Sequence, residues 1–558
     1  MPHHQKPTFR KLSQSRANKS ICTQAHIEIA RTIPRPIIQE YQSSISSGIN
    51  KFISNHKTKL QHLLDTSSTI QPIQSHHSIK TSYITETIHT TQLRVGCRHL
   101  NLADDPDATS FKIPSFIDIF RHLITLPAIT NQLTEEELAE LSRILAAPLK
   151  NDIYRALHNS PAGNKLADAY AYASAKRLID LTQKFPTTDF HSLLFNSFTS
   201  YTILELIESQ MNHVTICTLT HNGKQYPNFL YIFHHSRPRV SKLTKTSVLD
   251  VVEINQIAEN ILRRVVFLGE LINSTALPNR LIIFLTDAKK KIDDALEHNY
   301  HFRAMNVNTA VTNMRDIIIY RREELYKSIF HELIHFHNLD FKRLPIEINT
   351  MLLDYIHRTH NISSANEYLL YEAITESLAN TLNAAYLSRG IKEFRINLAR
   401  EIMFSTFQAA KILRLCGYNS WGEFTLLAGA GASVDTGAGA STGAGAGASV
   451  DGFMRGREGK QWRQDSCVFS YYVLKLYILL NLDDYWSHLL DARMKFQTSK
   501  SHFTYLLDIF ERGRNNFGLK KIMDYLLLAE SGIKLKKTQK NSKGKMINKT
   551  LRMTCLDG

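Results

Sequence analysis

The most constraining feature of the sequence is the run His331-Glu332-x-x-His335, which its neighbours place on a helix. Residues four apart on an α-helix lie one turn apart on the same face, so two imidazoles at this spacing can point at one ion. Tetrahedral Zn²⁺ accepts nitrogen ligands at about 2.0–2.1 Å. Glu332 lies beside the first histidine, where a general base for a metal-activated water belongs. The motif therefore predicts a zinc centre on a half-buried helix.

The residues before the motif predict two strands and a turn. Residues 307–311 and 316–320 have the pattern of short strands, and the second is a β-branched apolar run that ends at charges. Glu323 and Glu324 then open the helix, where the helix dipole favours acidic residues. An apolar stripe beside the histidine face predicts burial of the helix: Leu325, Ile329, Phe330, Leu333 and Ile334.

The next long helix carries a pair of acidic residues. An S-x-x-E capping box at Ser364 and Glu367 predicts where this helix begins, and Gly390 predicts where it ends. Glu372 and Glu376 lie one turn apart on it, and like charges at that spacing repel each other. The pair therefore predicts a positive group against this face, and a solvated acidic face is the alternative.

Together, His331, Glu332, His335, Glu372 and Glu376 resemble the site of gluzincin-type zincin metallopeptidases, over about residues 305–390. The resemblance implies one Zn²⁺ held by the two histidines and Glu372, with Glu376 bracing a ligating histidine. Glu376 stays open as the alternative third ligand. It also implies hydrolysis of peptide bonds with Glu332 as general base, and an edge strand that holds the peptide substrate above the metal.

Zincins often stabilise the oxyanion of the tetrahedral intermediate with a side chain from the C-terminal lobe. By that resemblance Tyr471 and Tyr472, on a helix expected over residues 467–482, are candidates, and core packing is the alternative for each. Segments 307–309, 331–340 and 469–472 are also similar to uncharacterised predicted metallopeptidases of large eukaryotic DNA viruses. This likeness implies a viral protein of the host cytoplasm or the virus particle.

Composition bounds the compartment. The chain has 558 residues, of which 43% are hydrophobic, and no uninterrupted apolar stretch is long enough to span a bilayer. The first residues lack the apolar region of a signal peptide. The six cysteines are scattered without a C-x-x-C pair, which favours a reducing compartment over a disulfide framework. We therefore expect a soluble intracellular protein without a membrane span.

The net charge of +16 belongs to the two ends. Residues 1–100 hold 13 Lys/Arg against four Asp/Glu, and residues 531–558 hold eight against one. We interpret these segments as a basic, partly disordered N-terminal arm and a basic C-terminal tail. Either can contact nucleic acid or another polyanion, and a solvated solubility tail is the alternative.

The expected fold class is α+β and predominantly helical. A helical region at residues 101–212 precedes a zincin-like domain at 213–530, which combines a small mixed sheet, the active-site helix and a helical C-terminal lobe. A hairpin turn at Asn222-Gly223 begins the domain. Gly/Ala/Ser repeats at 428–452 cannot form a core and predict a flexible insertion.

Two other functions remain open at this stage. The first is a zincin-like scaffold that binds or supports without catalysis, although such a scaffold has no need of the base Glu332. The second is a nucleic-acid-associated protein that acts through its basic ends. A peptidase is the interpretation that the five site residues favour.

Overall fold

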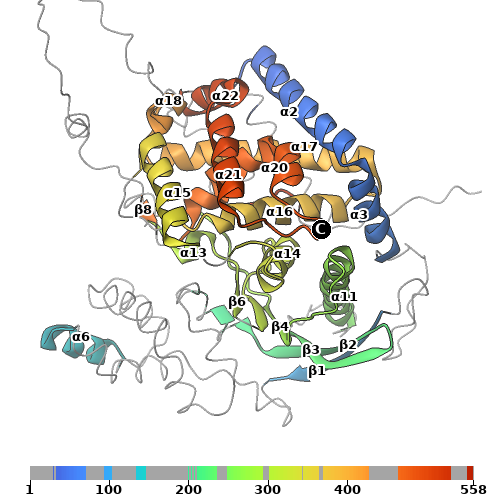
Figure 1. Ribbon diagram of the computed structural model, residues 1–558. Helices are drawn as coiled ribbons and strands as arrows, with labels where there is room; N and C mark the ends of the chain where they lie inside the picture. Colours follow the sequence, from blue (N-terminus) through green and yellow to red (C-terminus); the bar gives the residue numbers. More distant parts are fainter. Residues whose placement is uncertain are drawn as a thin grey trace, which may run out of the picture.

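The computed structural model describes residues 33–70, 93–102, 133–145, 211–235, 248–292, 301–341, 344–426, 463–528 and 550–556, with gaps at 314, 363–367 and 465 and a few isolated positions elsewhere. Within these residues the chain is an α+β protein, mostly helical, with a mixed sheet at one end and helices stacked beyond it (Figure 1). This confirms the predicted class. The repeat insertion at 428–452 lies outside the described residues.

The sheet contains the predicted hairpin. Strands β2 (His213–His221) and β3 (Lys224–His234) pair antiparallel, and Asn222 and Gly223 connect them with φ of 50° and 76°. A type I′ turn needs positive φ at both central residues, which Asn-Gly adopts at little cost. The local sequence therefore determines this turn.

The six strands lie in the order β1-β2-β3-β4-β7-β6. Strands β3, β4 (Arg280–Phe284) and β7 (Asp316–Ile319) run parallel. The edge strands β1 (Arg94–Asn101) and β6 (Ala310–Asn313) are antiparallel to their neighbours. Strand β6 begins later than predicted, because residues 304–307 form a turn of helix, α13 (Ala304–Val307).

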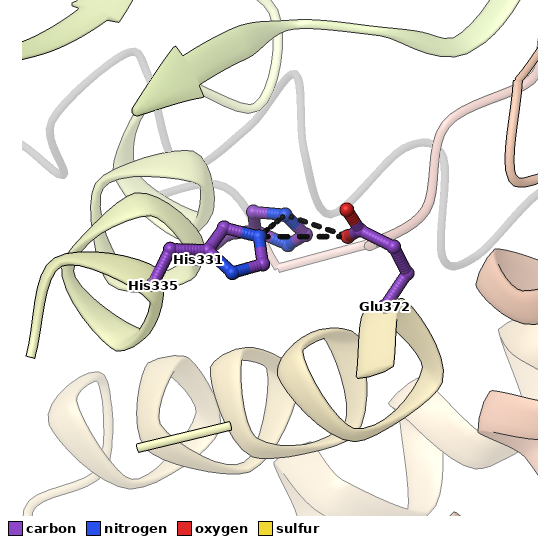
Figure 2. Close-up of side chains that lie close together, drawn as sticks. All are labelled: His331, His335 and Glu372. Atoms are coloured by element: carbon purple, nitrogen blue, oxygen red, sulfur yellow. Dashed lines mark hydrogen bonds and ion pairs between the residues drawn. The ribbon is translucent and has the colours of Figure 1, made fainter. Parts of the chain in front are cut away.

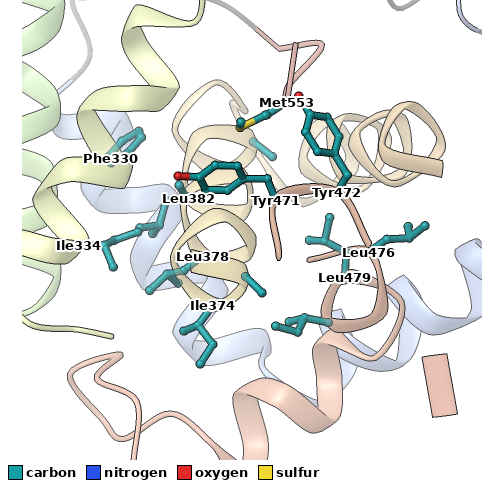
Figure 3. Close-up of a cluster of buried hydrophobic side chains, with 14 of the residues drawn as sticks. Phe330, Ile334, Ile374, Leu378, Leu382, Tyr471, Tyr472, Leu476, Leu479 and Met553 are labelled. Carbon is teal, nitrogen blue, oxygen red and sulfur yellow. The ribbon is translucent and has the colours of Figure 1, made fainter. Parts of the chain in front are cut away.

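Three helices connect the sheet to the helical layer. Helices α11 (Val248–Leu271) and α14 (Leu325–Phe336) lie on the sheet, and α16 (Tyr371–Tyr386) packs against α14 on the far side (Figure 1). Figure 3 shows apolar side chains of α14 facing those of α16: Phe330, Ile334, Ile374, Leu378 and Leu382. All five side chains are fully buried, so α16 runs through the centre of the molecule.

The start of α16 differs from the prediction. The helix begins at Tyr371, and the predicted capping box at Ser364 and Glu367 lies outside the described residues. Tyr368 and Leu370, just before the helix, are buried at 4% and 2% exposure. Two other predicted helices, at 345–360 and 392–415, are confirmed as α15 (Ile346–Thr359) and α17 (Ile391–Leu415).

The rest of the helical layer comes from late in the sequence. It comprises α18 (Trp421–Thr425), the π-helical turn η3 (Ser470–Leu474), α19 (Lys475–Leu480), α20 (Leu482–His488), α21 (Lys500–Arg514) and α22 (Phe517–Leu528). Two short strands, β5 (His301–Phe302) and β8 (Arg463–Gln464), form a separate parallel pair. In the predicted region 101–212 the structure describes α6 (Glu135–Leu145). No helix among the described residues is long and apolar enough to cross a bilayer.

Part of the predicted N-terminal arm belongs to the same core. Helices α2 (Arg35–Asn55) and α3 (Lys57–Ile70) pack on the helical layer, where Phe52 is fully buried and meets Trp486 edge-on at 5.0 Å between ring centroids. The Tyr41 hydroxyl lies 2.9 Å from Thr406 Oγ1. Apolar residues at helical spacing within this otherwise polar sequence thus bring α2 and α3 into the core, and the domain start at residue 213 stays a prediction.

The segment 550–556, in the predicted basic tail, is also packed into the core: residues 550–555 are buried and Leu556 is partly buried. The Glu324 carboxylate accepts the backbone N–H groups of Met553 and Thr554, at 2.5 and 2.6 Å. Glu401 Oε1 accepts those of Cys555 and Leu556, at 3.0 and 2.9 Å. Buried side chains of the helical layer thus hold this segment by its main chain.

The cysteines are partly paired, against expectation. Cys97 and Cys217 face each other on β1 and β2, with Cα atoms 4.2 Å apart, and form a disulfide. Cys555 is also disulfide-bonded. Cys416 and Cys467 are buried. The first pair is 120 residues apart in sequence, so only the pairing of the strands could reveal it.

Candidate metal centre

Helix α14 places both histidines of the H-E-x-x-H motif on one buried face. His331 and His335 are 8% and 9% exposed, and their Nε2 atoms lie 3.1 Å apart. The helix begins at Leu325, later than predicted, because Glu324 takes a left-handed backbone with φ of 62°. The Glu324 carboxylate is bonded to Lys290 and to residues 553–554, which hold it outside the helix.

Glu372, in the first turn of α16, completes a cluster of three possible ligands. Its Oε2 lies 3.2 Å from His331 Nε2 and 3.6 Å from His335 Nε2 (Figure 2). Atoms bound to one tetrahedral ion at about 2.0–2.1 Å lie about 3.3–3.4 Å from each other. The three atoms therefore have the separations that one metal ion requires, and these residues could hold one.

A carboxylate lies behind each ring, on the side away from this cluster. His335 Nδ1 lies 2.6 Å from Asp340 Oδ2, so Nδ1–H donates to the carboxylate and Nε2 faces the cluster. His331 Nδ1 lies 3.4 Å from Glu376 Oε1. A carboxylate that accepts from the Nδ1–H of a metal-bound histidine orients the ring and raises the basicity of the ligand. Asp340 is placed to do this for His335.

Glu376 supports the centre from behind and is not one of the three clustered ligands. Its Oε1 lies 2.5 Å from Lys327 Nζ, and both groups are buried. Burial alone would raise the pKa of Glu376, but Lys327 and His331 outweigh it and hold the pKa well below its usual range. The acidic pair Glu372 and Glu376 predicted a positive group against this helix face. The structure places Lys327 against Glu376 and the two imidazoles against Glu372.

The charges around the histidines favour a cation. Burial would lower the pKa of His335, but Glu372 and Asp340 raise it well above its ordinary value. The pKa of His331 is also raised, despite burial, by Glu372 and Glu376. The same pairing holds the pKa of Glu372 at about 2, although burial opposes it. The pocket therefore stabilises positive charge, whether protons or a metal ion.

Glu332 lies beside the cluster without joining it. It is 4% exposed, and its Oε1 lies 4.0 Å from His331 Nε2. The other carboxylate oxygen accepts a hydrogen bond from Thr312 Oγ1 at 2.7 Å, and Thr312 lies on the edge strand β6. One oxygen is thus anchored to the sheet, which leaves Oε1 next to the point where the metal ligands converge.

The two candidate tyrosines have different places. Tyr471 lines the cavity at the site, and its ring centroid lies 6.2 Å from that of His331. The Tyr472 hydroxyl donates to the carbonyl of Leu551, and its ring is fully buried in the core beside Tyr471 (Figure 3). The π-helical turn η3 carries both residues, and such turns are frequent at functional sites.

The three clustered atoms open onto a cavity of about 270 Å³. Strand β6 and the residue before it form one wall, and helices α14 and α16 form another. Other lining residues come from the segment after β4, from η3 and from the buried segment 550–556: Lys290, Tyr471 and Met553. A substrate group that enters this cavity meets the ligands, Glu332 and Tyr471 together.

The structure brings together His331, Glu332, His335, Glu372 and Glu376, as the sequence predicts. Sequence reasoning missed the roles of Asp340, Thr312, Lys290 and Lys327. Asp340 carries a weak signal, since an acid five residues after a histidine at a helix end can fold back on it. Thr312 carries no such signal in the sequence, because threonine is common on strands whether or not it has a role in a site.

Fold and site together define an α+β protein with a candidate His-His-Glu metal centre. No protein-family model matches the chain, and no solved structure matches it significantly. A stretch of 116 residues is 31% identical to "Uncharacterized protein R210" of Acanthamoeba polyphaga mimivirus. The match covers 19% of this chain and 28% of that protein. The chain is therefore similar, over a small part, to a viral protein whose name assigns no activity.

Proposed function

We propose that this chain is a zinc-dependent peptidase of the gluzincin type. The observation that carries the proposal is the convergence of His331, His335 and Glu372 within ligand distance of one point, with the unligated carboxylate of Glu332 beside them. Three protein ligands with one open position is the pattern of catalytic zinc. A centre that served structure alone would have no need of the adjacent carboxylate.

The donor set fits Zn²⁺. Two imidazole nitrogens and one carboxylate oxygen are ligands that Zn²⁺ accepts, and the carboxylates of Asp340 and Glu376 lie behind the rings. Zn²⁺ bound there supplies a Lewis acid that polarises the scissile carbonyl and acidifies water. The buried cysteines Cys416 and Cys467 do not line the cavity, so neither offers a thiolate ligand there.

Glu332 does the proton chemistry in this proposal. Its Oε1 takes a proton from the attacking water and then passes it to the leaving amine. The Thr312 hydroxyl binds the other oxygen and keeps the carboxylate from rotating. Tyr471 faces the same cavity, where its hydroxyl can donate a hydrogen bond to the oxyanion.

The surrounding fold supports a peptide substrate. Strand β6 is an edge of the sheet, antiparallel to β7, and residues 309–312 line the cavity beside α14. An edge strand leaves backbone groups with which an extended peptide can pair. The order of strand, metal helix and later glutamate helix is the one that the zincin resemblance implies. The partial likeness to a mimivirus protein supports a viral relationship and adds nothing on substrate.

Zinc content and cleavage of a mixed peptide library, measured on the full chain and its variants, test the proposal. We expect about one zinc per chain in the wild type and in Glu332→Gln, with cleavage in the wild type alone. His335→Ala and Glu372→Gln should lose the metal. Glu376→Gln should bind zinc more weakly. If Glu376→Gln loses all zinc while Glu372→Gln keeps it, the third ligand is Glu376 and not Glu372.

Two results would contradict the proposal. Wild-type protein that takes up no zinc on reconstitution would remove the metal centre. Zinc-loaded wild type that cleaves no peptide in the library would favour a zincin-like binding scaffold instead. The matched control is Glu347→Gln, an exposed glutamate in the first turn of α15, which should leave both zinc and cleavage unchanged.

A further inference from the structure

One end of the cavity contains two buried lysines. Lys290 and Lys327 line the same cavity as the clustered ligands, and each is 2% exposed. Lys327 lies one turn before His331 on α14, and Lys290 follows strand β4. Their ammonium groups are therefore at the inner wall of the site, on the side of the N-terminal end of the metal helix.

Both ammonium groups have N–H donors to spare. An ammonium has three N–H donors. Among the described residues, Lys290 Nζ has Glu324 Oε2 at 2.6 Å, and Lys327 Nζ has Glu376 Oε1 at 2.5 Å and Met553 Sδ at 4.0 Å. A thioether sulfur is a weak acceptor. A group in the cavity can therefore accept hydrogen bonds from both lysines.

The two lysines belong to a cluster of buried charges. The ammonium groups of Lys290, Lys327 and Lys475 lie among the carboxylates of Glu324, Glu376 and Glu401. Burial lowers the pKa of Lys290 to about 8, although Glu324 opposes this, whereas Glu376 and Glu324 outweigh burial and raise the pKa of Lys327. A carboxylate that accepts a hydrogen bond from Lys290 would therefore favour the charged form of this lysine.

The carboxylates that face the cavity already have partners. Glu332 accepts from Thr312, Glu376 pairs with Lys327, and Glu372 belongs to the metal ligands. They repel an incoming anion less than free carboxylates would. Met553 Sδ lies 4.0 Å from Lys327 Nζ, and other apolar or small residues line the cavity: Val307 and Ser328. Such a wall accommodates a short aliphatic stem that ends in a charged group.

We propose that this end of the cavity is a carboxylate subsite, and that the substrate is a peptide with a carboxylate close to the scissile bond. The carboxylate belongs either to an aspartate or glutamate side chain or to the C-terminus of the peptide. Its role in cleavage rests on the proposed peptidase function. The binding of a peptide carboxylate by Lys290 and Lys327 does not, and it can be measured separately.

Binding to the full-length Glu332→Gln variant, measured by calorimetry with and without zinc, tests the subsite. The probes are two blocked peptides, Ac-AAFEAA-amide and Ac-AAFQAA-amide, and a second pair, Ac-AAFA as free acid and as amide. We expect about tenfold tighter binding of one charged member than of its neutral partner. A preference within the first pair identifies a side-chain carboxylate, and one within the second pair identifies a terminal carboxylate. Equal binding within both pairs overturns the proposal.

Variants assign the preference to the lysines. Lys290→Met with Glu324→Gln removes one ammonium without leaving its buried partner charged, and should abolish the preference. Met553→Glu places a carboxylate at the same wall and should also abolish it, while binding of the neutral peptides persists. Lys411→Met is the control, because Lys411 is half-buried on α17, donates to the Thr550 carbonyl and does not line the cavity. A preference that survives in both subsite variants contradicts the assignment.

Cleavage of the same four peptides by zinc-loaded wild type separates the two proposals. Cleavage with no preference for a charged member removes the carboxylate subsite and leaves the peptidase. Carboxylate-dependent binding without cleavage of any peptide leaves the subsite and counts against the peptidase.

Discussion

Two side chains outside the motif hold a candidate ligand and the proposed base. Asp340 binds His335 Nδ1 at 2.6 Å and is itself bound by Thr375 Oγ1 at 3.2 Å. Thr312 binds the Glu332 carboxylate at 2.7 Å. In the proposed function each would be a positioning residue, which acts through its neighbour, and each has a measurable effect of its own.

Asp340→Asn should weaken zinc binding by about 10–100-fold, because the amide no longer holds His335 with its Nε2 lone pair toward the ligand point. Competition with a chelating dye measures the affinity. Asp354→Asn on the exposed side of α15 is the control and should change nothing. An unaltered zinc affinity in Asp340→Asn would show that the carboxylate plays no part in orienting the ring.

Thr312→Val should lower kcat by about 10–100-fold, the cost of losing a hydrogen bond to a charged group. Zinc content should stay at the wild-type level, because Thr312 does not touch the ligands. Thr312→Ser keeps the hydroxyl and should recover most of the rate. If Val and Ser variants are equally active, the hydroxyl does not position Glu332.

Among the elements, the segment 550–556 connects helices that lie far apart in sequence. Glu401 on α17 accepts the N–H groups of Cys555 and Leu556 and the hydroxyl of Thr554, all through Oε1. Burial raises the pKa of Glu401 to about 7, despite these hydrogen bonds. The folded state therefore favours the protonated form of Glu401, because burying the neutral carboxyl does not require the desolvation of a charge.

Glu401→Gln should remove a pH-dependent loss of stability. At pH below about 4.5 the Glu401 carboxyl is protonated in both the folded and the unfolded state, so its ionisation takes nothing from the free energy of unfolding. As pH rises to about 7 the unfolded state ionises first, so up to about 3 kcal/mol of stability is lost. Urea denaturation should give equal stability for variant and wild type near pH 4.5, and a more stable variant at pH 8. Glu393→Gln, exposed on the same helix, is the control. Parallel pH curves for Glu401→Gln and wild type would contradict the expectation.

Comparison of elements shows what the sequence could predict. The hairpin at Asn222-Gly223, the helix of His331 and the position of Glu372 follow from spacing over a few residues, and all were predictable. The packing of Phe52 against Trp486, and of Met553 into the cavity wall, joins residues hundreds of positions apart. No local pattern encodes such contacts. The basic composition of residues 1–100 and 531–558 instead suggested a partly disordered arm and a tail.

At the scale of the whole molecule, the candidate metal centre joins two layers. His331 and His335 come from α14, which lies on the sheet, and Glu372 comes from α16, in the helical layer (Figure 1). The same two helices share the apolar contact seen in Figure 3. An ion held by all three ligands would therefore couple the sheet layer to the helical layer.

Zinc should stabilise the whole fold through this coupling. A ligand that binds the folded state alone raises the free energy of unfolding by about 2.7 kcal/mol at a hundredfold excess over its Kd. Thermal unfolding of metal-free protein, repeated with added zinc, should show this rise in the wild type and in Glu332→Gln, which keeps all three ligands. His335→Ala should show none. Amide hydrogen exchange should slow on both α14 and α16 when zinc is added, since both helices supply ligands to the ion. Slowing confined to α14 would mean that Glu372 does not bind the metal, and that the ion adds nothing to the contacts already present between the two layers.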